Sequence, residues 1–174
     1  LHMFKISGAI LVIFSSCAMG LYLSNELKTR IVDLKELKKI LLLLRGDIQY
    51  ANTPLPEAVQ ALSRRHDGKF KGFLENISQR LLKLRGESFG VIWKEGVEKD
   101  LTHTSFSKED YALLNQLGEN LGYLDKNMQI GTLDLYLEQI EETINSLSQS
   151  VKDKTYLYNS LGIMGGIFIT IILL

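Results

Sequence analysis

Few residues of this sequence have the types and spacing that catalysis, cofactor binding or metal binding requires. The carboxylates Glu138, Glu141 and Glu142 could suggest a metal site, but no histidine accompanies them and a basic segment is expected opposite. His66 and His103 lie among polar residues that predict exposed turns. The phosphate-binding loop, the dinucleotide-binding glycine pattern and the zinc-protease motif are absent from the sequence. We therefore expect no catalytic, cofactor-binding or metal-ligating residue, no hydrolase chemistry, and a protein that is not an enzyme.

The charged residues are distributed unevenly along the 174-residue chain. There are 20 basic and 20 acidic residues, and all but Lys5 lie within a central region, residues 24–154. Uncharged runs of 20 residues flank this region. Because about 20 apolar helical residues cross the apolar core of a bilayer, we predict transmembrane helices over residues 3–23 and 155–174. The zero net charge argues against nucleic acid as a partner.

The N-terminal run allows alternatives to a membrane anchor. Leu1 and His2, before Met3, are expected to be a cloning remnant. The apolar run is longer than the roughly 7–15 residues of a signal-peptide h-region, which favours an anchor over a cleaved signal. A lipoprotein signal also stays open, because Phe14-Ser-Ser-Cys17 resembles a lipobox. Cys17 is the single cysteine, so the chain can form no internal disulfide.

Basic residues beside the two runs predict an orientation in a membrane, because cytoplasmic flanks of spans carry an excess of Lys and Arg. Only Lys5 precedes the first run, whereas seven basic residues follow it or precede the second: Lys28, Arg30, Lys35, Lys38, Lys39, Lys152 and Lys154. The central region is therefore expected in the cytoplasm. Gly162 and Gly166 have the spacing that lets membrane helices pack closely, as in a homo-oligomer, although small residues are common in such helices.

Two long segments have the periodicity of amphipathic helices, with apolar residues at intervals of three or four. In the first segment these are Leu27, Ile31, Leu34, Leu37, Leu41, Leu44 and Ile48. In the last they are Ile130, Leu133, Leu137, Ile140, Ile144, Leu147 and Val151. Asp125 is the expected N-cap of the last helix. Both helices are expected to continue into the uncharged runs.

Between these segments, residues typical of helix starts and ends predict four shorter helices. Thr53 before Pro54 suggests an N-cap with proline at the first helical position, and this helix should end near Gly68. The next should end at Gly86, and a further helix should occupy residues 88–99 with Trp93 in the core.

Ser107 and Asp110 resemble a capping box, which should start a helix closed by Gly118 and Gly122. Since the loops are short, we predict an all-α fold, an antiparallel bundle of about six helices. Its first and last helices should be continuous with the two transmembrane spans.

If the two long helices are antiparallel, residues whose numbers add to about 178 should lie side by side. This register matches charges: Lys35 with Glu142, Lys38 and Lys39 with Glu138 and Glu141, and Arg45 with Asp134. The alternative is two solvated faces that differ in charge, because exposed ion pairs contribute only about 0–1 kcal/mol each.

The segment Leu114-Asn-Gln-Leu-Gly-Glu-Asn-Leu-Gly122, followed by Asp125 and Gln129, resembles a motif of the stage III sporulation protein AB family of endospore-forming bacteria. Gly8-Ala9, Thr53-Pro-Leu-Pro-Glu-Ala58, Trp93, Leu161-Gly162 and Gly165-Gly166 also lie where that family has them. A departure at Tyr123-Leu124, where a smaller polar residue is expected, puts the details of that turn in doubt. The Gly-Glu-x-x-Gly element also resembles the cytoplasmic F domain of type II secretion and type IV pilus platform proteins.

The resemblance implies a non-enzymatic membrane platform in a secretion-like complex between mother cell and forespore. Its implied partners are a secretion-type ATPase and other stage III sporulation proteins, and its implied location is the mother-cell-derived outer forespore membrane. The alternative is a two-span signalling protein whose bundle senses a cytoplasmic ligand. A sensor would need convergent buried polar groups, whereas the predicted core is Leu, Ile and Phe.

The motif residues Gly118, Glu119, Gly122, Asp125 and Gln129 are expected to form a structural joint and, second, a contact site. Glycine near a helix C-terminus permits a left-handed conformation or a close backbone approach. A carboxylate there opposes the helix dipole, so Glu119 should have a compensating partner. That partner could be Arg85 of this chain or a basic residue of another protein.

We predict that residues 24–154 fold alone as a soluble, mostly helical domain, because their charges and capping signals are complete without the flanking runs. The circular dichroism spectrum of this segment should show mainly helix. A spectrum dominated by strand or coil would contradict the prediction.

Overall fold

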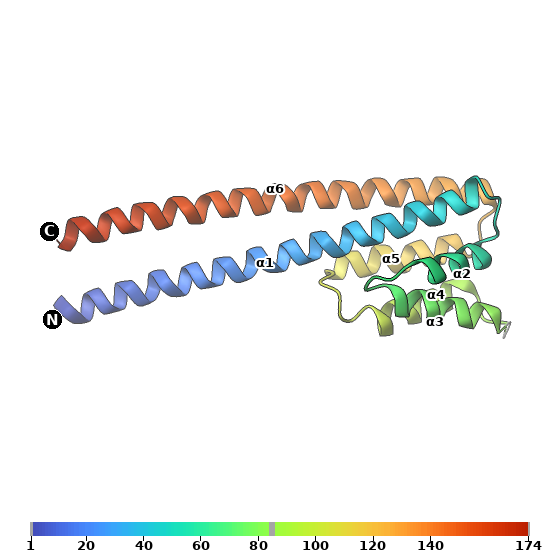
Figure 1. The fold of residues 1–174 in the computed structure, drawn as a ribbon, viewed down its shortest axis with the longest axis horizontal. Coiled ribbons are helices and arrows are strands. Elements are labelled where there is room, and N and C mark those ends of the chain that lie inside the picture. The colour runs from blue at the N-terminus through green and yellow to red at the C-terminus, as the bar shows by residue number, and fades with distance from the viewer. Residues whose placement is uncertain (1, 84–85, 174) are drawn as a thin grey trace. The chain divides into compact units, whose positions relative to one another are not determined.

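The computed structural model describes residues 2–83 and 86–173, with side chains described from residue 25 onward and only in part beyond residue 154. This part of the chain forms six α-helices and no strand (Figure 1). The helices are α1 (His2–Gln49), α2 (Leu55–Arg65), α3 (Lys71–Leu82), α4 (Phe89–Asp100), α5 (Lys108–Leu121) and α6 (Lys126–Leu173). The predicted all-α fold and number of helices are confirmed.

Among the residues that the structure describes, no helix combines the length and apolar character needed to cross a membrane. The two predicted spans, residues 3–23 and 155–174, consist mostly of residues whose side chains lie outside the described part. The surroundings of Gly162 and Gly166 lie there too. The structure therefore lends the predicted spans no support.

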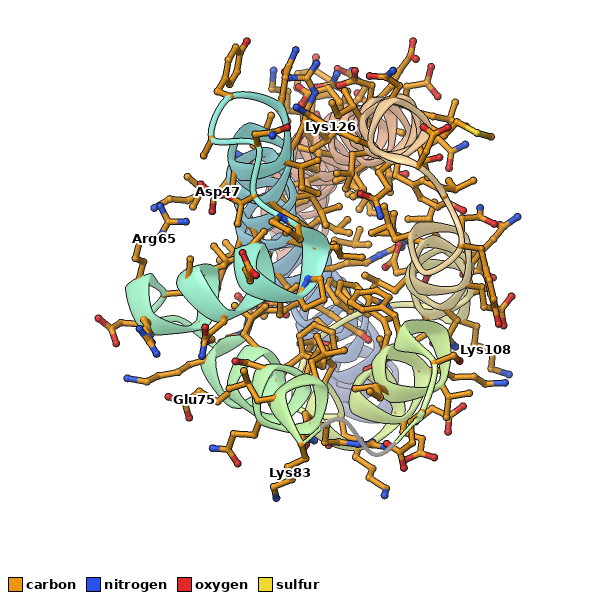
Figure 2. The ribbon with its side chains drawn as sticks, turned by 90° about the vertical axis from the view of Figure 1, so that its right-hand side faces the viewer. Asp47, Arg65, Glu75, Lys83, Lys108 and Lys126 are labelled. Atoms are coloured by element: carbon orange, nitrogen blue, oxygen red, sulfur yellow. The ribbon has the colours of Figure 1, made fainter. Side chains whose placement is uncertain are left out.

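Two compact units divide the chain: residues 32–144, and residues 1–31 with 145–174. The first unit is the helical bundle. Viewed along its long helices, it has α1 and α6 on one side and α2 to α5 on the other (Figure 2). The predicted stripe of α1 faces the core, where Leu34, Leu37, Leu41, Leu44 and Ile48 are buried together with Ile40, which the predicted stripe did not include.

The start of α5 is the predicted capping box. The backbone N–H of Ser107 donates to Asp110 Oδ2 at 2.8 Å, and the N–H of Asp110 donates to Ser107 Oγ at 3.3 Å. Asp125 caps α6 as predicted, because its Oδ1 accepts the N–H of Met128 at 3.0 Å. Side-chain oxygens thus satisfy N–H groups that have no partner inside either helix.

The predicted N-cap of α2 is wrong. Pro54 rather than Thr53 occupies the cap position, since its carbonyl accepts the N–H of Ala58 at 2.9 Å, and no side chain caps this helix. Helix α2 ends at Arg65, near the predicted end at Asp67-Gly68, whereas α3 ends at Leu82, before the predicted end at Gly86.

Two of the predicted charge pairs join α1 to α6 within the bundle. Lys38 pairs with Glu141, and Arg45 pairs with Asp134. The hydrogen bonds that Arg45 donates to Asp134 raise the pKa of Arg45 above its usual value, so the guanidinium stays charged. The prediction is wrong for the other four residues, which are exposed and make no ion pair in the described part of the chain: Lys35, Lys39, Glu138 and Glu142.

A buried carboxylate, which the sequence did not reveal, connects α1 to two loops. Asp33 is fully buried; its Oδ1 accepts from Lys69 Nζ at 2.6 Å and its Oδ2 from the N–H of Ser105 at 2.8 Å. A buried charge is tolerated when it is paired and hydrogen-bonded in this way. The α2–α3 and α4–α5 loops are therefore both held on α1.

The predicted exposure of the histidines holds for one of the two. His103 is exposed, with Nε2 3.1 Å from the Lys69 carbonyl oxygen. His66, by contrast, has a side chain only 10% exposed, with Nε2 2.8 Å from Glu36 Oε1. The prediction of an exposed turn is wrong at His66 because the loop is held against α1.

Asp33→Ala should lower the free energy of unfolding by about 2–4 kcal/mol, because it removes two hydrogen bonds and leaves the N–H of Ser105 without its partner. Urea unfolding of residues 24–154, followed by circular dichroism, measures the change. Asp67→Ala is the matched control, since it removes a similar Asp–Lys pair at 2.8 Å on the surface. Equal effects of the two substitutions would contradict the assigned role of Asp33.

Candidate functional site

The candidate site is the crossing of α4 and α5, where the two backbones approach closely. A Cβ atom added to Gly90 would lie 3.3 Å from the Cα of Glu119, and one added to Gly122 would lie 3.3 Å from the N of Gly90. Such contacts are tighter than side chains normally make, so glycine permits this approach. Gly90 is a site residue that the sequence analysis missed, although an isolated glycine inside a helix was a signal for it.

Trp93 fills the centre of the crossing. Its indole Nε1 donates to the Leu114 carbonyl oxygen at 2.8 Å, and its side chain is buried. A Cβ atom at Gly118 would fall on the indole ring, far inside van der Waals contact. Phe73 of α3 packs edge-on against the indole, with ring centroids 5.0 Å apart. Trp93 therefore joins α3, α4 and α5. Its predicted place in the core is confirmed.

The left-handed conformation considered for Gly118 and Gly122 is not found. Helix α5 continues through Leu121, so Gly118 lies inside it, and Gly122 has right-handed helical angles of φ −69° and ψ −20°. Close approach, the other predicted reason for glycine, applies to both. The left-handed glycine of the described chain is Gly86, at φ +78°.

Asp125 and Gln129 form the joint between α5 and α6. Asp125 caps α6, and its backbone carbonyl accepts the N–H of Gln129 at 2.8 Å. Gln129 Nε2 donates to the Leu121 carbonyl oxygen at 3.0 Å, at the C-terminal end of α5. Both side chains satisfy helix ends, so their contacts are structural.

Glu119 is exposed and makes no ion pair with any residue that the structure describes. Arg85, its predicted internal partner, lies outside the described residues. The next residue, Asn120, donates from Nδ2 to the Tyr136 hydroxyl at 3.3 Å. Burial raises the pKa of Tyr136, and the charge of Glu119 raises it further, so this hydroxyl remains protonated near neutral pH.

A hollow of about 410 Å³ opens beside the crossing. Its lining comes from the start of α4 and the end of α5: Ser88, Gly90, Val91, Lys94, Glu119, Asn120 and Tyr123. We call these seven residues the α4–α5 groove. Val91 is 49% exposed and Tyr123 is 81% exposed, so large apolar surface lies beside one cation and one anion. Tyr123, which the sequence analysis expected to be a smaller polar residue, is therefore part of the groove.

The expectation of no hydrolase chemistry overlooked one match, since Gly86, Ser88 and Gly90 have the G-x-S-x-G spacing of hydrolases. In those enzymes the serine follows a strand and is exposed for attack. Here Ser88 is the N-cap of α4, accepting the N–H of Val91 at 3.4 Å. No hydrogen bond in the described chain joins it to a histidine, and the described residues include no cluster suited to a metal ion.

The fold and the site define a small all-helical bundle whose distinctive feature is a groove beside two closely packed helices. A family model described as stage III sporulation protein AB matches residues 5–174, and the chain belongs to this family. It is 24% identical to the stage III sporulation protein AB of Bacillus subtilis (strain 168) over 172 residues, 99% of this chain and 100% of the relative.

A solved structure of a stage III sporulation protein AB is also similar. Its TM-score is 0.63 at 26% sequence identity, and the match covers 71% of this chain and 97% of that one. The predicted family is thus confirmed by sequence and by fold. Membership in the family supports a role in sporulation.

Gly118→Ala should lower the free energy of unfolding by about 1–3 kcal/mol, because the added methyl group displaces Trp93. Urea unfolding measured by tryptophan fluorescence reports both the stability and the environment of this single tryptophan. Gly72→Ala is the matched control, because nothing lies within 4 Å of the added Cβ atom. It should leave stability unchanged or raise it by less than about 1 kcal/mol. Equal results for both variants would contradict a close contact at Gly118.

Proposed function

We propose that this protein is a non-enzymatic platform of a secretion-like complex between mother cell and forespore. In this proposal its bundle receives a secretion-type ATPase or another stage III sporulation protein at the α4–α5 groove. The observation that carries the proposal is Glu119. An exposed carboxylate near a helix C-terminus, without an ion pair among the described residues, opposes the helix dipole and is available to another protein.

The composition of the groove suits a protein partner. Exposed Val91 and Tyr123 offer apolar area, Tyr being common at interfaces, and Lys94 and Glu119 offer charges for orientation. Trp93 and the glycine contacts hold α4 and α5 together beneath the groove, so the surface of the α4–α5 groove is preorganised. Preorganisation favours affinity because little conformational freedom is lost on binding.

The sensor alternative has less support. A ligand sensor needs convergent polar groups inside a pocket, whereas Asp33, Ser63 and Asp110, which are buried, make hydrogen bonds within the chain. The α4–α5 groove itself is lined largely by exposed residues.

Anchoring in the mother-cell-derived outer forespore membrane is part of the proposal and rests on the sequence. The uncharged runs 6–25 and 155–174 have the length of spans, and each falls largely within a helix that also contributes to the bundle. The basic residues that flank the runs favour a bundle in the mother-cell cytoplasm.

Glu119→Gln should leave unfolding unchanged but weaken capture of the secretion-type ATPase by about tenfold, because a charge-assisted contact is lost. The measurement is co-purification with the tagged chain from sporulating cells, together with the count of heat-resistant spores. Glu75→Gln, an exposed change on α3 (Figure 2), is the control and should affect neither.

Loss of stability in Glu119→Gln would instead indicate a partner within the chain, such as Arg85. If stability, capture and spore count all stay unchanged, Glu119 has no role in the interaction and the proposed groove is wrong.

A further inference from the structure

The outward face of α1 in the bundle carries lysines between apolar residues and is not used in the core. Its residues are spaced by three or four positions, which places them on one side of the helix. They are Val32, Lys35, Lys39, Leu42, Gly46 and Tyr50. The opposite side of the same helix carries the buried stripe.

The outward face of α6 carries glutamates where α1 carries lysines. Its residues are Met128, Gly131, Leu135, Glu138 and Glu142, again spaced by three or four. Because both helices bury their other side against the core, the two faces point away from α2 to α5, along the upper edge of Figure 2. We call these eleven residues the α1–α6 face.

Three features of this face have no explanation within the described part of the chain. Its four charged residues make no ion pair in the part of the chain described, and its five large apolar side chains are between 49% and 81% exposed. Gly46 and Gly131 lie within helices but have nothing within 4 Å of the place of a Cβ atom. Glycine costs about 1 kcal/mol relative to alanine in such positions, and no internal contact requires it.

The register of the bundle relates the two faces. The internal pairs Lys38–Glu141 and Arg45–Asp134 both have residue numbers that add to 179, so residues with this sum lie at the same height along the bundle. With sums of 177 or 178, the face matches Lys35 to Glu142, Lys39 to Glu138, Leu42 to Leu135, Gly46 to Gly131 and Tyr50 to Met128. Cation thus matches anion, apolar matches apolar and glycine matches glycine at these five levels, while Val32 has no counterpart within the face.

We propose that the α1–α6 face docks on the same face of a second copy of this chain, about a two-fold axis parallel to α1 and α6. Rotation about such an axis preserves height and places α1 of one copy opposite α6 of the other. Every match then forms twice, which is the defining property of a two-fold interface. The facing glycines let the helices approach closely, and the apolar pairs supply the buried area.

A second copy fits better than another occupant. The face carries two lysines and two glutamates and is neutral, whereas an anionic lipid surface favours an uninterrupted basic face. A different protein could bind α1 and α6 at unrelated heights. It would therefore give no reason for Lys39 and Glu138 to lie at the same height within one chain. This inference does not depend on the α4–α5 groove, which lies on other helices.

Charge reversal tests the pairing in the full-length chain, purified in mild detergent and studied by analytical ultracentrifugation. Lys39→Glu and Glu138→Lys should each weaken self-association about tenfold or more, because each places like charges together at two symmetric points. A mixture of the two variants should associate like the unmodified chain, because each charge then meets its opposite. Lys108→Glu, an exposed change on α5, is the control and should have no effect.

Disulfide formation tests the geometry independently. In a Cys17→Ser background, a copy with Leu42→Cys and a differently tagged copy with Leu135→Cys, expressed together, should form a disulfide-linked pair on mild oxidation. Leu42→Cys alone should not, because the two α1 helices lie diagonally across the axis. The proposal is overturned by a monomeric unmodified chain, by self-association indifferent to both charge reversals, or by efficient linkage through Leu42→Cys alone.

Discussion

The contact between the Trp93 indole and the bare backbone of Gly118 is the constraint on which the bundle's smaller helices depend. Because residue 118 has no side chain, the indole lies against α5 and its N–H reaches the Leu114 carbonyl oxygen. Phe73 from α3 and Phe89 from the start of α4 pack on the same ring. One aromatic side chain thus fixes three helices, and the groove beside them follows from the resulting close approach of Gly90 to α5.

The segment from Leu114 to Gln129, on which the resemblance to the family was based, therefore has two kinds of residue with different physical roles. Gly118, Gly122, Asp125 and Gln129 are explained by packing and by the satisfaction of helix ends. Glu119 is not explained in this way, since its charge is unfavourable beside the end of α5. A residue that works against its own helix is a better candidate for recognition than one that stabilises it.

Polar interactions determine how the two layers of the bundle are joined. Burial of apolar side chains supplies most of the favourable free energy of folding, while the exposed ion pairs between α1 and α6 contribute about 0–1 kcal/mol each and chiefly select the register of these two helices. Asp33 acts differently because it is buried, and its bonds to Lys69 and Ser105 hold two loops on α1. The layer formed by α1 and α6 also carries lysines and glutamates on its outward side, where no residue in the described part of the chain forms an ion pair with them.

The sequence by itself determined the helices, because apolar periodicity and capping residues act over a few positions. The stripe of α1, the capping box of Ser107 and the cap of Asp125 were all predictable for this reason. Only the tertiary structure decided which charged residues face inward. Lys38 pairs across the seam while Lys39 points outward, and Asp33 and His66 lie against neighbouring elements. These outcomes depend on the rotation of each helix about its axis relative to residues distant in the chain, which no local pattern encodes. The crossing at Gly90 and Gly122 belongs to the same class, because a close approach requires two helices and is a property of neither alone.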